Sequence, residues 1–415
     1  MKRNNFLIFK YYIYFIVAAA AMLTLSGCIE EYEADISEKD SNLLVVEGTI
    51  CSAKWNKFIL SRTQPLHGTY EPYVSDLYPS YNSYNPQLVV GAAVSVRGSD
   101  GSEYLAQEGF DPEYISPGTY GYYYCWVDTL DPDTEYYLHI EVDGEVYESK
   151  PQKPLRTEEI AEVRAVQNTR ESDIDVLVTP AEPFEPDKVN YYSWTFDETW
   201  EVHPDYTTII YFDPREMKPV VKRGQFPERG WKDATASAIM VGSSNSYDGQ
   251  HIQQLKMYGI NCSDERMFYR YSGLVHQRAI TKDEYEYELA RRQASSEMGG
   301  LVTPQPSALP TNIRCLTSSK HVIGFVGCSM NTSEYRFFLD AEDFSVYYPQ
   351  HGDTRYWLVS PTDTELLQMV YRGMFLCEWE DPIKSSDGLL HTAWAFDYQL
   401  DVRCQGAYVE QPDFW

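Results

Sequence analysis

The stretch Leu130-Asp131-Pro132-Asp133-Thr134-Glu135-Tyr136 decides the fold expected for the first part of the chain. It leads into an alternating segment that ends at Val142, and Asp143-Gly144 separates this segment from residues 145–148. An Asp-Gly pair supplies the positive φ angles that a two-residue hairpin turn requires. A second signal of the same kind, Ser99-Asp100-Gly101, lies upstream. Both signals predict antiparallel strands joined by tight turns.

Four residues of this stretch resemble the Leu-x-Pro-x-Thr-x-Tyr corner of fibronectin type III domains: Leu130, Pro132, Thr134 and Tyr136. In such a corner the tyrosine hydroxyl bonds back to upstream backbone and fixes the turn between two sheets. We therefore expect residues 41–155 to form an immunoglobulin-like (fibronectin III-like) β-sandwich. The motif indicates a fold and carries no information on activity.

The remainder of the chain also favours β-structure, because its tyrosines, 35 in the whole chain, and its frequent apolar–polar alternation are typical of strands. Lys150-Pro151-Gln152-Lys153-Pro154 predicts an interdomain joint, since its prolines cannot continue a β-ladder. The fold class expected is mainly β, with the N-terminal sandwich followed by a larger β-rich domain over residues 156–415 that contains one or two helices. Strands are expected at residues 43–50, 57–61, 94–97, 103–105, 136–142, 145–148, 174–178, 190–202, 208–212, 321–327 and 334–339.

Two segments indicate helices in the second domain. Thr281 with Glu284 three residues later forms a capping box, and good helix formers continue through residues 282–297. The Glu and Arg residues of this helix are expected on a solvated face. A shorter helix is expected from Asp363 to Arg372.

An aromatic run in the second domain has two interpretations. Tyr192, Trp194 and Phe196 fall on one face of an expected strand by period-two alternation. Core packing is the simpler interpretation, because large aromatic side chains dominate protein cores. The alternative is a platform on which sugar rings stack.

The N-terminus carries the features of a secretory signal. Lys2 and Arg3 precede an almost wholly apolar run that ends at Leu25 and is too short to span a membrane. Leu25-Ser26-Gly27-Cys28 resembles the bacterial lipobox, in which the cysteine sulfur is acylated and the peptide is cut before it. We expect residues 1–27 to be a lipoprotein signal peptide and Cys28 to be lipidated, so that several acyl chains hold the protein to a membrane. The alternative is an ordinary signal peptide with an incidental cysteine.

Acidic residues follow this cysteine at once. Glu30, Glu31 and Glu33 resemble the export tag of Bacteroidota lipoproteins that reach the outer face of the outer membrane. A solvated acidic linker is the alternative, since charge runs usually have that role. With the tag, residues 28–40 become a tether that holds the folded chain at the outer membrane, facing the cell exterior.

Composition limits the partners of the chain. The formal net charge is −28, so nucleic acid would repel the chain, and peripheral docking on anionic lipid is equally disfavoured. Of the 8 cysteines, those beyond Cys28 are odd in number and none is at metal-ligand spacing from another. Buried small side chains, or one or two disulfides, would account for them.

The segment between Gln64 and Gln87 differs from its surroundings. It is rich in proline and almost without aliphatic residues, and its tyrosines are Tyr70, Tyr73, Tyr78, Tyr81 and Tyr84. Tyrosine gives a large contact area at a small entropic cost, which suits recognition loops. A candidate binding loop and a mobile insertion are equally good interpretations.

The sequence contains no catalytic motif. The 8 histidines lack metal-binding spacing, and no nucleophile elbow, phosphate loop or dinucleotide turn occurs. A pair of glycosidase carboxylates would be invisible in the sequence, because there are 62 acidic residues. We therefore expect no catalytic residues, no metal and no cofactor.

Several separated segments together resemble the Bacteroidota outer-membrane lipoprotein family known as domain of unknown function 4249. They are residues 43–50 with 58–66, 191–200, 272–277 through the expected helix into 303–313, and Pro412-Asp413-Phe414-Trp415. The resemblance implies an outer-membrane lipoprotein that is often a companion of TonB-dependent transporters, and it implies no established chemistry. We expect a non-catalytic accessory to such a transporter, acting in substrate capture or gating. The alternatives are a stand-alone glycan- or protein-binding adhesin and a surface hydrolase.

Overall fold

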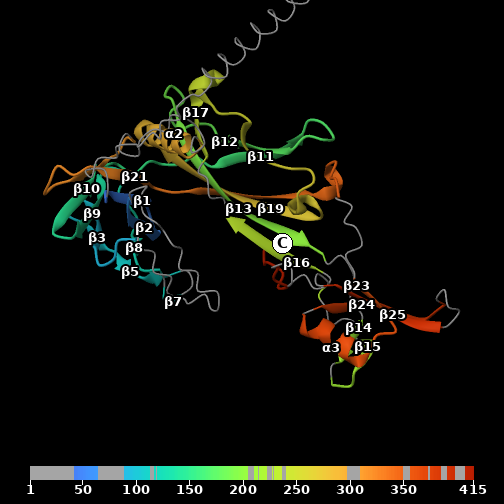
Figure 1. Cartoon of the computed structure of the whole chain (residues 1–415). Helices are drawn as coiled ribbons and strands as arrows, with labels where there is room; N and C mark the ends of the chain where they lie inside the picture. The colour runs from blue at the N-terminus through green and yellow to red at the C-terminus, as the bar shows by residue number, and fades with distance from the viewer. Residues whose placement is uncertain are drawn as a thin grey trace, which may run out of the picture. The chain divides into compact units, whose positions relative to one another are not determined.

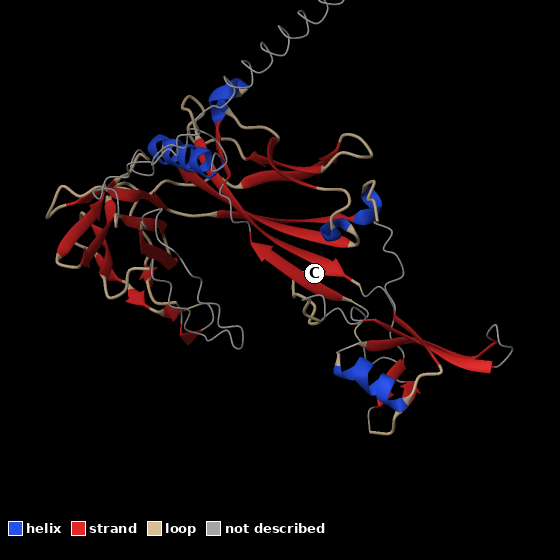
Figure 2. Cartoon of the chain, in the orientation of Figure 1, coloured by secondary structure: helices blue, strands red, loops and turns tan. Residues whose placement is uncertain are grey.

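The fold is mainly β, as predicted, and strands make up 50% and helices 12% of the described residues. Figure 2 shows that strands make up most of the described chain. The computed structural model describes residues 42–63, 88–112, 116–117, 119–203, 210–213, 215–221, 227, 229–235, 240–296, 309–348, 356–372, 374–384, 390–397 and 407–415.

Two five-stranded sheets build the first part of the fold (Figure 1). In spatial order, the first sheet contains β21 (Val322–Ser329), β1 (Leu44–Cys51), β2 (Lys54–Arg62), β8 (Tyr122–Val127) and β5 (Gln107–Glu108). The second contains β20 (Ile313–Cys315), β10 (Glu145–Ser149), β9 (Tyr136–Val142), β3 (Ala93–Gly98) and β4 (Glu103–Leu105). Both sheets bury alternate residues in one hydrophobic core that includes Phe58, Leu60, Val96, Tyr123 and Leu138. We call this unit the N-terminal sandwich.

The tight hairpins of the sandwich contain the turn residues noted in the sequence. Asp143 and Gly144 have φ angles of 53° and 77°, and they join β9 to β10 in antiparallel register. Gly101 has a φ angle of 90° in the turn between β3 and β4. There the carboxylate of Asp100 accepts the backbone N–H of Ser102 at 2.9 Å. Both turns therefore have a local cause in their own residues.

The corner before β9 is closed by one side chain. Tyr136 is buried, and its hydroxyl accepts a hydrogen bond from the backbone N–H of Asp131 at 3.0 Å. The backbone N–H of Thr134 bonds to the carbonyl of Asp131 at 3.2 Å, so Pro132 lies inside a tight turn. Leu130 belongs to the core of the sandwich. The corner thus fixes where β9 begins.

The sandwich extends beyond the range 41–155 expected from the sequence. β20 pairs with β10, and β21 runs parallel to β1 from Leu44 opposite Val322 to Cys51 opposite Ser329. Both added strands come from far beyond the expected joint at 150–154. A parallel pairing between distant segments leaves no tight-turn signal in the sequence, because a long crossover connects its two strands. The chain therefore leaves the sandwich near residue 155 and re-enters it later.

A second core lies between two further sheets. Tyr192 and Trp194 are 2% and 0% exposed in this core, so the sugar-stacking alternative is wrong for them and core packing is confirmed. Phe196 is partly buried and stacks on Tyr258, with ring centroids 4.0 Å apart. One sheet, which we call the central sheet, has the order β16 (Gly230–Thr235), β13 (Tyr191–Val202), β19 (Arg270–Ile280) and β22 (Ser333–Asp340), with β17 (Met240–Ser243) also on β13. The other has the order β11 (Ile160–Gln167), β12 (Ile174–Pro180) and β18 (Leu255–Ile260).

The two α-helices of the described residues lie where the sequence predicts them, as α2 (Lys282–Ser296) and α3 (Asp363–Tyr371). Thr281 caps α2 by accepting the N–H of Glu284 at 3.1 Å, but the Glu284 carboxylate bonds to Arg278 instead of completing a capping box. Glu284 is buried, so the expected solvated face is wrong for this residue. The charge of Glu284 is neutralised by Arg278, which lies before the helix in β19 and is not part of the helical sequence pattern.

The remaining described elements form one small core, two strand pairs and several 3-10 helices. A small core that includes Leu366, Trp394 and Phe396 joins α3 to a sheet of β23 (Tyr356–Val359), β25 (Leu390–Asp397) and β24 (Phe375–Lys384). The others are β6 (Phe110–Asp111) with β7 (Ser116–Pro117), β14 (Ile210–Asp213) with β15 (Lys218–Val221), and the 3-10 helices η2 (Ser244–Ser246), η3 (Asp248–Gln250), η4 (Glu265–Met267) and η6 (Ala341–Asp343).

Residues 407–415 lie against the central sheet. Tyr408 and Trp231 exchange two backbone hydrogen bonds, of 2.8 and 2.9 Å. Trp415 packs edge-on against Trp231, with ring centroids 6.2 Å apart. The guanidinium of Arg336 lies 3.5 Å from the centre of the Phe414 ring. Backbone pairing and cation–π contacts therefore hold this segment in place.

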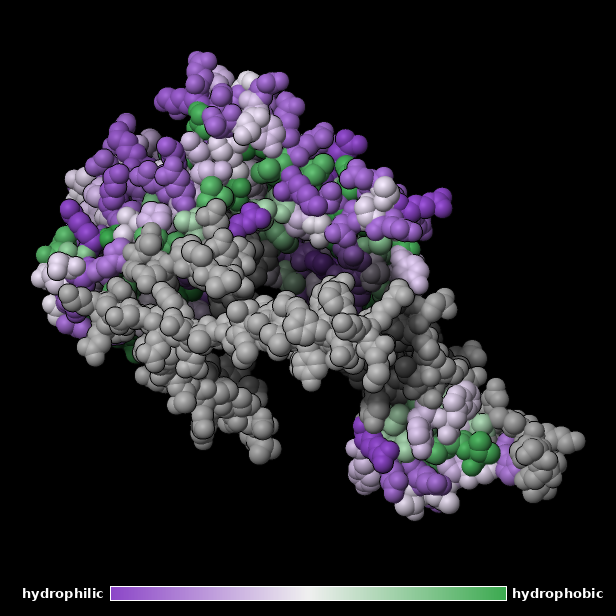
Figure 3. Space-filling view, turned by 45° about the horizontal axis from the view of Figure 1, so that its top comes forward, coloured by the Kyte–Doolittle hydropathy of each residue, from purple (hydrophilic) through white to green (hydrophobic). Residues whose placement is uncertain are grey.

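The surface is largely polar. On the face drawn in Figure 3, the described residues are mostly hydrophilic, with scattered hydrophobic patches. This agrees with a formal net charge of −28. None of the helices in the described ranges is both long and apolar enough to cross a bilayer.

Candidate functional site

An exposed aromatic pair lies on the outer face of the first sheet of the N-terminal sandwich. Trp55 of β2 and Trp126 of β8 are direct cross-strand partners, with ring centroids 5.7 Å apart and ring planes at 70°. The two residues are 44% and 45% exposed. Their strand neighbours Asn56 and Cys125 are buried. Period-two alternation therefore places both indoles on the solvent side, and we call them the tryptophan pair.

Charged groups border this pair. The ammonium of Lys57 lies 4.1 Å from the centre of the Tyr122 ring. Trp126 Nε1 donates a hydrogen bond to the carboxylate of Asp128 at 3.0 Å, which orients its indole. Flat apolar rings beside a cation and a carboxylate suit a ligand that has both apolar and polar faces.

A cavity of about 390 Å³ lies beside the central sheet. Ser193, Thr195 and Asp197 alternate along β13 and line one wall. In the antiparallel register of β19, Arg278 is opposite Ser193 and His276 is opposite Thr195, and both line the same wall. Two paired strands therefore set the spacing of this wall.

The other side of the cavity comes from β1, the start of β2 and the residue before β22. It contains Thr49 and Cys51 of β1, Lys54 at the start of β2, and Thr332. Burial raises the pKa of the Cys51 thiol, so this cysteine is protonated and unreactive near neutral pH. Because four of the lining side chains carry a hydroxyl, we call this space the hydroxyl cavity.

His276 is held between two carboxylates in the wall of the cavity. Its Nε2 lies 2.9 Å from Asp197 Oδ2, and its Nδ1 lies 3.2 Å from Glu334 Oε1. Asp197 also accepts the hydroxyl of Thr235 at Oδ1, at 2.8 Å. These bonds hold both ring nitrogens, so the imidazole is a fixed part of the wall.

A buried ion pair borders the same cavity. Arg278 Nη2 lies 2.5 Å from Glu284 Oε1, and the two side chains are 14% and 6% exposed. Gly327 of β21 leaves space for the pair, because a Cβ there would lie 2.6 Å from Glu284 Oε2 and 2.7 Å from Arg278 Nη1. Nη1 itself is buried without a hydrogen-bond partner. The pair therefore joins β19 to α2 and passes β21 at Gly327, where no side chain is in the way.

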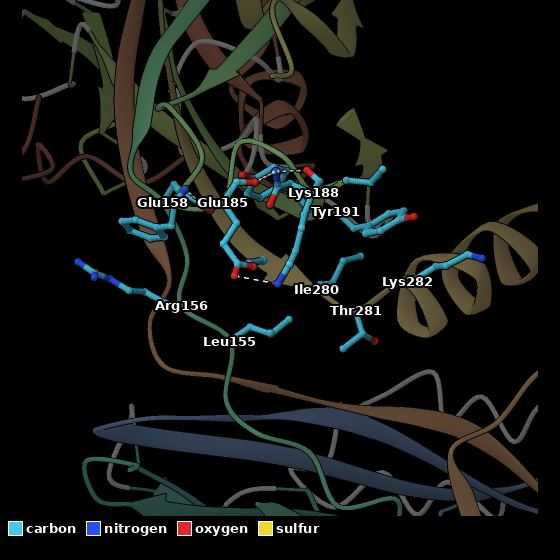
Figure 4. A pocket seen from close by; sticks show the side chains of 14 residues that line it. Leu155, Arg156, Glu158, Glu185, Lys188, Tyr191, Ile280, Thr281 and Lys282 are labelled. Atoms are coloured by element: carbon cyan, nitrogen blue, oxygen red, sulfur yellow. Dashed lines mark hydrogen bonds and ion pairs between the residues drawn. The ribbon is translucent and has the colours of Figure 1, made fainter. Parts of the chain in front are cut away.

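A second cavity, of about 460 Å³, lies at the start of α2 (Figure 4). We call it the α2 cavity. The guanidinium of Arg156 lies 4.1 Å from the centre of the Phe184 ring. Lys188 pairs with Glu185 at 2.8 Å, which Figure 4 marks with a dashed line. Glu158 is buried, and both of its carboxylate oxygens accept hydrogen bonds of 3.0 Å. The charged groups around this cavity thus already have partners inside the protein.

The buried glutamates of the described residues have structural partners as well. Glu198 accepts hydrogen bonds from Arg266 at 2.7 Å and from the hydroxyl of Tyr271 at 2.8 Å. Glu201 lies 2.6 Å from Nε2 of His203. Each carboxylate therefore neutralises or orients a neighbouring side chain. Within the same ranges, no three His, Cys, Asp or Glu side chains converge into a possible metal site.

The cysteines of the described residues favour one of the two alternatives left by the sequence. Cys51, Cys125, Cys262, Cys315 and Cys328 are free, and all except Cys315 are buried. Burial raises the pKa of Cys125 to about 11 and that of Cys328 to about 12. The four buried cysteines thus behave as small apolar side chains rather than as disulfides or reactive thiols.

The predicted site residues fall into two groups. Most lie outside the described residues: Cys28, Glu30, Glu31 and Glu33, and also Tyr70, Tyr73, Tyr78, Tyr81 and Tyr84. The corner residues lie in the N-terminal sandwich and line neither cavity: Leu130, Pro132, Thr134 and Tyr136. Sequence reasoning missed the tryptophan pair, although Trp55 alternates with the buried Asn56 and Trp126 lies between the buried Cys125 and Val127.

Comparison with protein families matches residues 29–335 to a domain of unknown function, DUF4249. The matched range includes the tryptophan pair and every residue that lines the hydroxyl cavity, and it ends before Pro412-Asp413-Phe414-Trp415. A search of curated proteins gives no significant match. Because the match covers well over half of the 415 residues, this chain belongs to the DUF4249 family.

Proposed function

We propose that this protein is a surface-exposed outer-membrane lipoprotein that captures a ligand for a TonB-dependent transporter and catalyses no reaction itself. The lipobox-like sequence around Cys28 and the acidic residues after it support the anchor and its outward position. The family resemblance supports the link to a transporter. The observation that carries the capture role is the tryptophan pair.

The exposure of this pair has a cost that binding would offset. Burying one large apolar side chain stabilises a fold by about 1.5–3 kcal/mol, and the sandwich forgoes much of that at two adjacent positions. Exposed aromatic residues held close together are typical of binding surfaces, where they contribute most of the binding energy. The hydrogen bond from Trp126 to Asp128 fixes one ring before any ligand arrives, which lowers the entropic cost of binding.

Copurification from native outer membranes tests the transporter link. The full chain with an affinity tag is extracted in mild detergent, and the associated proteins are identified by mass spectrometry. We expect a large β-barrel protein in the eluate. A Cys28→Ala variant, which cannot be acylated, is the control for membrane attachment. If no barrel accompanies the lipidated protein although it still binds ligand, a stand-alone adhesin replaces the proposed function.

Substitution of the tryptophan pair tests the capture role. Trp55→Ala and Trp126→Ala should each weaken ligand binding by about tenfold or more, because each removes a central exposed ring. Tyr371→Ala is the matched control, since Tyr371 is also an exposed aromatic residue (85%) and lies on α3. Equally strong ligand binding in all three variants would show that the tryptophan pair does not contribute to capture, and the capture role would lose its support.

A further inference from the structure

We infer that the hydroxyl cavity is a carbohydrate-binding site. This inference deepens the capture role proposed above and rests on it for its biological use. Each described residue that lines this cavity has a polar or thiol group in its side chain, and none of them is Ala, Val, Leu, Ile, Met, Phe, Tyr or Trp. Small-molecule pockets are usually lined mainly by apolar and aromatic groups. Side chains that present hydroxyl, amide and charged groups among short apolar stems suit a ligand that carries many polar groups on a small apolar frame.

The cavity has unused hydrogen-bonding capacity. The hydroxyls of Thr49, Ser193, Thr195 and Thr332 line it, and none of them bonds to another described residue. A hydroxyl group both donates and accepts, so each can pair with a ligand hydroxyl in either direction. A sugar ring carries several hydroxyls at fixed angles around a compact body. Of the common metabolite classes, carbohydrates match this set of partners best.

The wall that carries two of these hydroxyls is rigid. Ser193 and Thr195 lie in β13, which is hydrogen-bonded to β19 along its length. Gln277, which also lines the cavity, accepts a hydrogen bond from Trp194 Nε1 at 2.9 Å and donates one to a backbone carbonyl at 2.8 Å. Groups that are already in position lose little conformational entropy when a ligand binds.

The lining of the cavity contains charged groups of both signs. Arg278 is paired with Glu284, and Asp197 is bonded to His276. Lys54 is exposed and forms no ion pair with the rest of the described chain. This ammonium is therefore available to donate a hydrogen bond to a ligand oxygen, such as a sugar hydroxyl or carboxylate.

The size and the location of the cavity fit the same ligand class. Its volume of about 390 Å³ lies within the range of roughly 300–1,000 Å³ that is usual for small-molecule sites. Thr49, Thr195 and Thr332 are only partly buried, so solvent reaches the lining. Lys54 is followed directly by Trp55, so the lining of the cavity and the tryptophan pair are adjacent in the sequence.

Ligand-observed NMR and calorimetry test the inference on the full chain in detergent, with a panel of neutral and acidic mono- and disaccharides. We expect at least one sugar to bind. Ser193→Ala and Thr195→Val should each raise its Kd by about two- to tenfold, which corresponds to the loss of one hydrogen bond. Thr364→Val is the matched control, because Thr364 is exposed on α3 and does not line the cavity. Melting temperatures of the variants confirm that all of them are folded.

Two results would overturn the inference: no sugar of the panel binds, or a bound sugar has the same Kd in wild type, Ser193→Ala and Thr195→Val. In the second case, a weaker affinity in Trp55→Ala places the sugar on the tryptophan pair, so that the capture function survives without this site. If Thr195→Val weakens the affinity for the sugar and Trp55→Ala leaves it unchanged, the cavity is the binding site. The tryptophan pair then no longer supports the proposed capture function. The failures of the two proposals are therefore distinguishable.

Discussion

Replacement of Glu284 by glutamine tests the buried ion pair that joins α2 to the central sheet. The change keeps the shape of the side chain and removes its charge, so that Arg278 remains charged at a side-chain exposure of 14%. One of its nitrogens, Nη1, already lacks a partner. Removing one member of a buried pair costs about 3–5 kcal/mol of unfolding free energy. Because the glutamine amide can still accept one hydrogen bond, we expect about 3 kcal/mol.

Urea unfolding followed by tryptophan fluorescence measures this loss as a lower transition midpoint. Glu286→Gln is the matched control on the same helix. Its carboxylate is 54% exposed and lies 3.4 Å from the ammonium of Lys282. Such an exposed pair contributes about 0.5 kcal/mol or less to the unfolding free energy, so the transition midpoint of the control should be close to that of the wild type.

The result that would refute this reasoning is a loss below about 1 kcal/mol for Glu284→Gln, or equal losses for the two single variants. A double variant, Arg278→Met with Glu284→Leu, gives an independent check. Well-packed apolar residues commonly replace a buried pair without loss, so the double variant should be more stable than Glu284→Gln alone.

Three further predictions concern backbone space, acid stability and thiol reactivity. Gly324→Ala should lower the unfolding free energy by about 3 kcal/mol or more, because its Cβ would lie 2.0 Å from a β1 carbonyl oxygen. Gly91→Ala has open space around its Cβ and should cost only about 1–2 kcal/mol. Equal losses for the two variants in urea unfolding would contradict this. Burial alone would raise the pKa of Asp264, but hydrogen bonds from a neighbouring arginine outweigh it and lower that pKa. The ionised Asp264 carboxylate therefore stabilises the fold above its unfolded pKa of about 3.9, and this stabilisation is lost as the pH falls through and below that value. Asp264→Asn should reduce the fall in unfolding free energy between about pH 5 and 3, and an unchanged fall would refute this. Burial likewise favours a higher pKa for Cys315, yet hydrogen bonds from two neighbouring hydroxyls lower it. Iodoacetamide at about pH 8 should therefore label Cys315 before the buried Cys125 in peptide mapping, and the reverse order would contradict the structure.

Features with a local cause could be predicted from the sequence. The hairpin at Asp143-Gly144 depends on the φ angles that these two residues tolerate, and the end of β10 before Pro151 depends on a missing N–H group. The start of α2 depends on one cap, Thr281. In each case the residues that decide the conformation are also the residues that adopt it.

Features that depend on distant contacts could not be predicted. The parallel pairing of β1 with β21 joins Leu44 to Val322, and no nearby turn connects them. The hydroxyl cavity exists only because Thr49 and Thr195 face the same space in the folded chain. Alternation alone shows that Trp55 is on the opposite face from its buried neighbours, but whether another element covers it depends on the fold.

Mass spectrometry of the N-terminal peptide from native outer membranes tests the membrane-anchored capture function most directly. We predict that this peptide begins at Cys28 and carries diacylglycerol in a thioether together with an acyl chain on its new amino group. An unmodified Cys28 thiol, or a peptide that continues uncut into Gly27, would contradict the lipid anchor on which the proposed function depends.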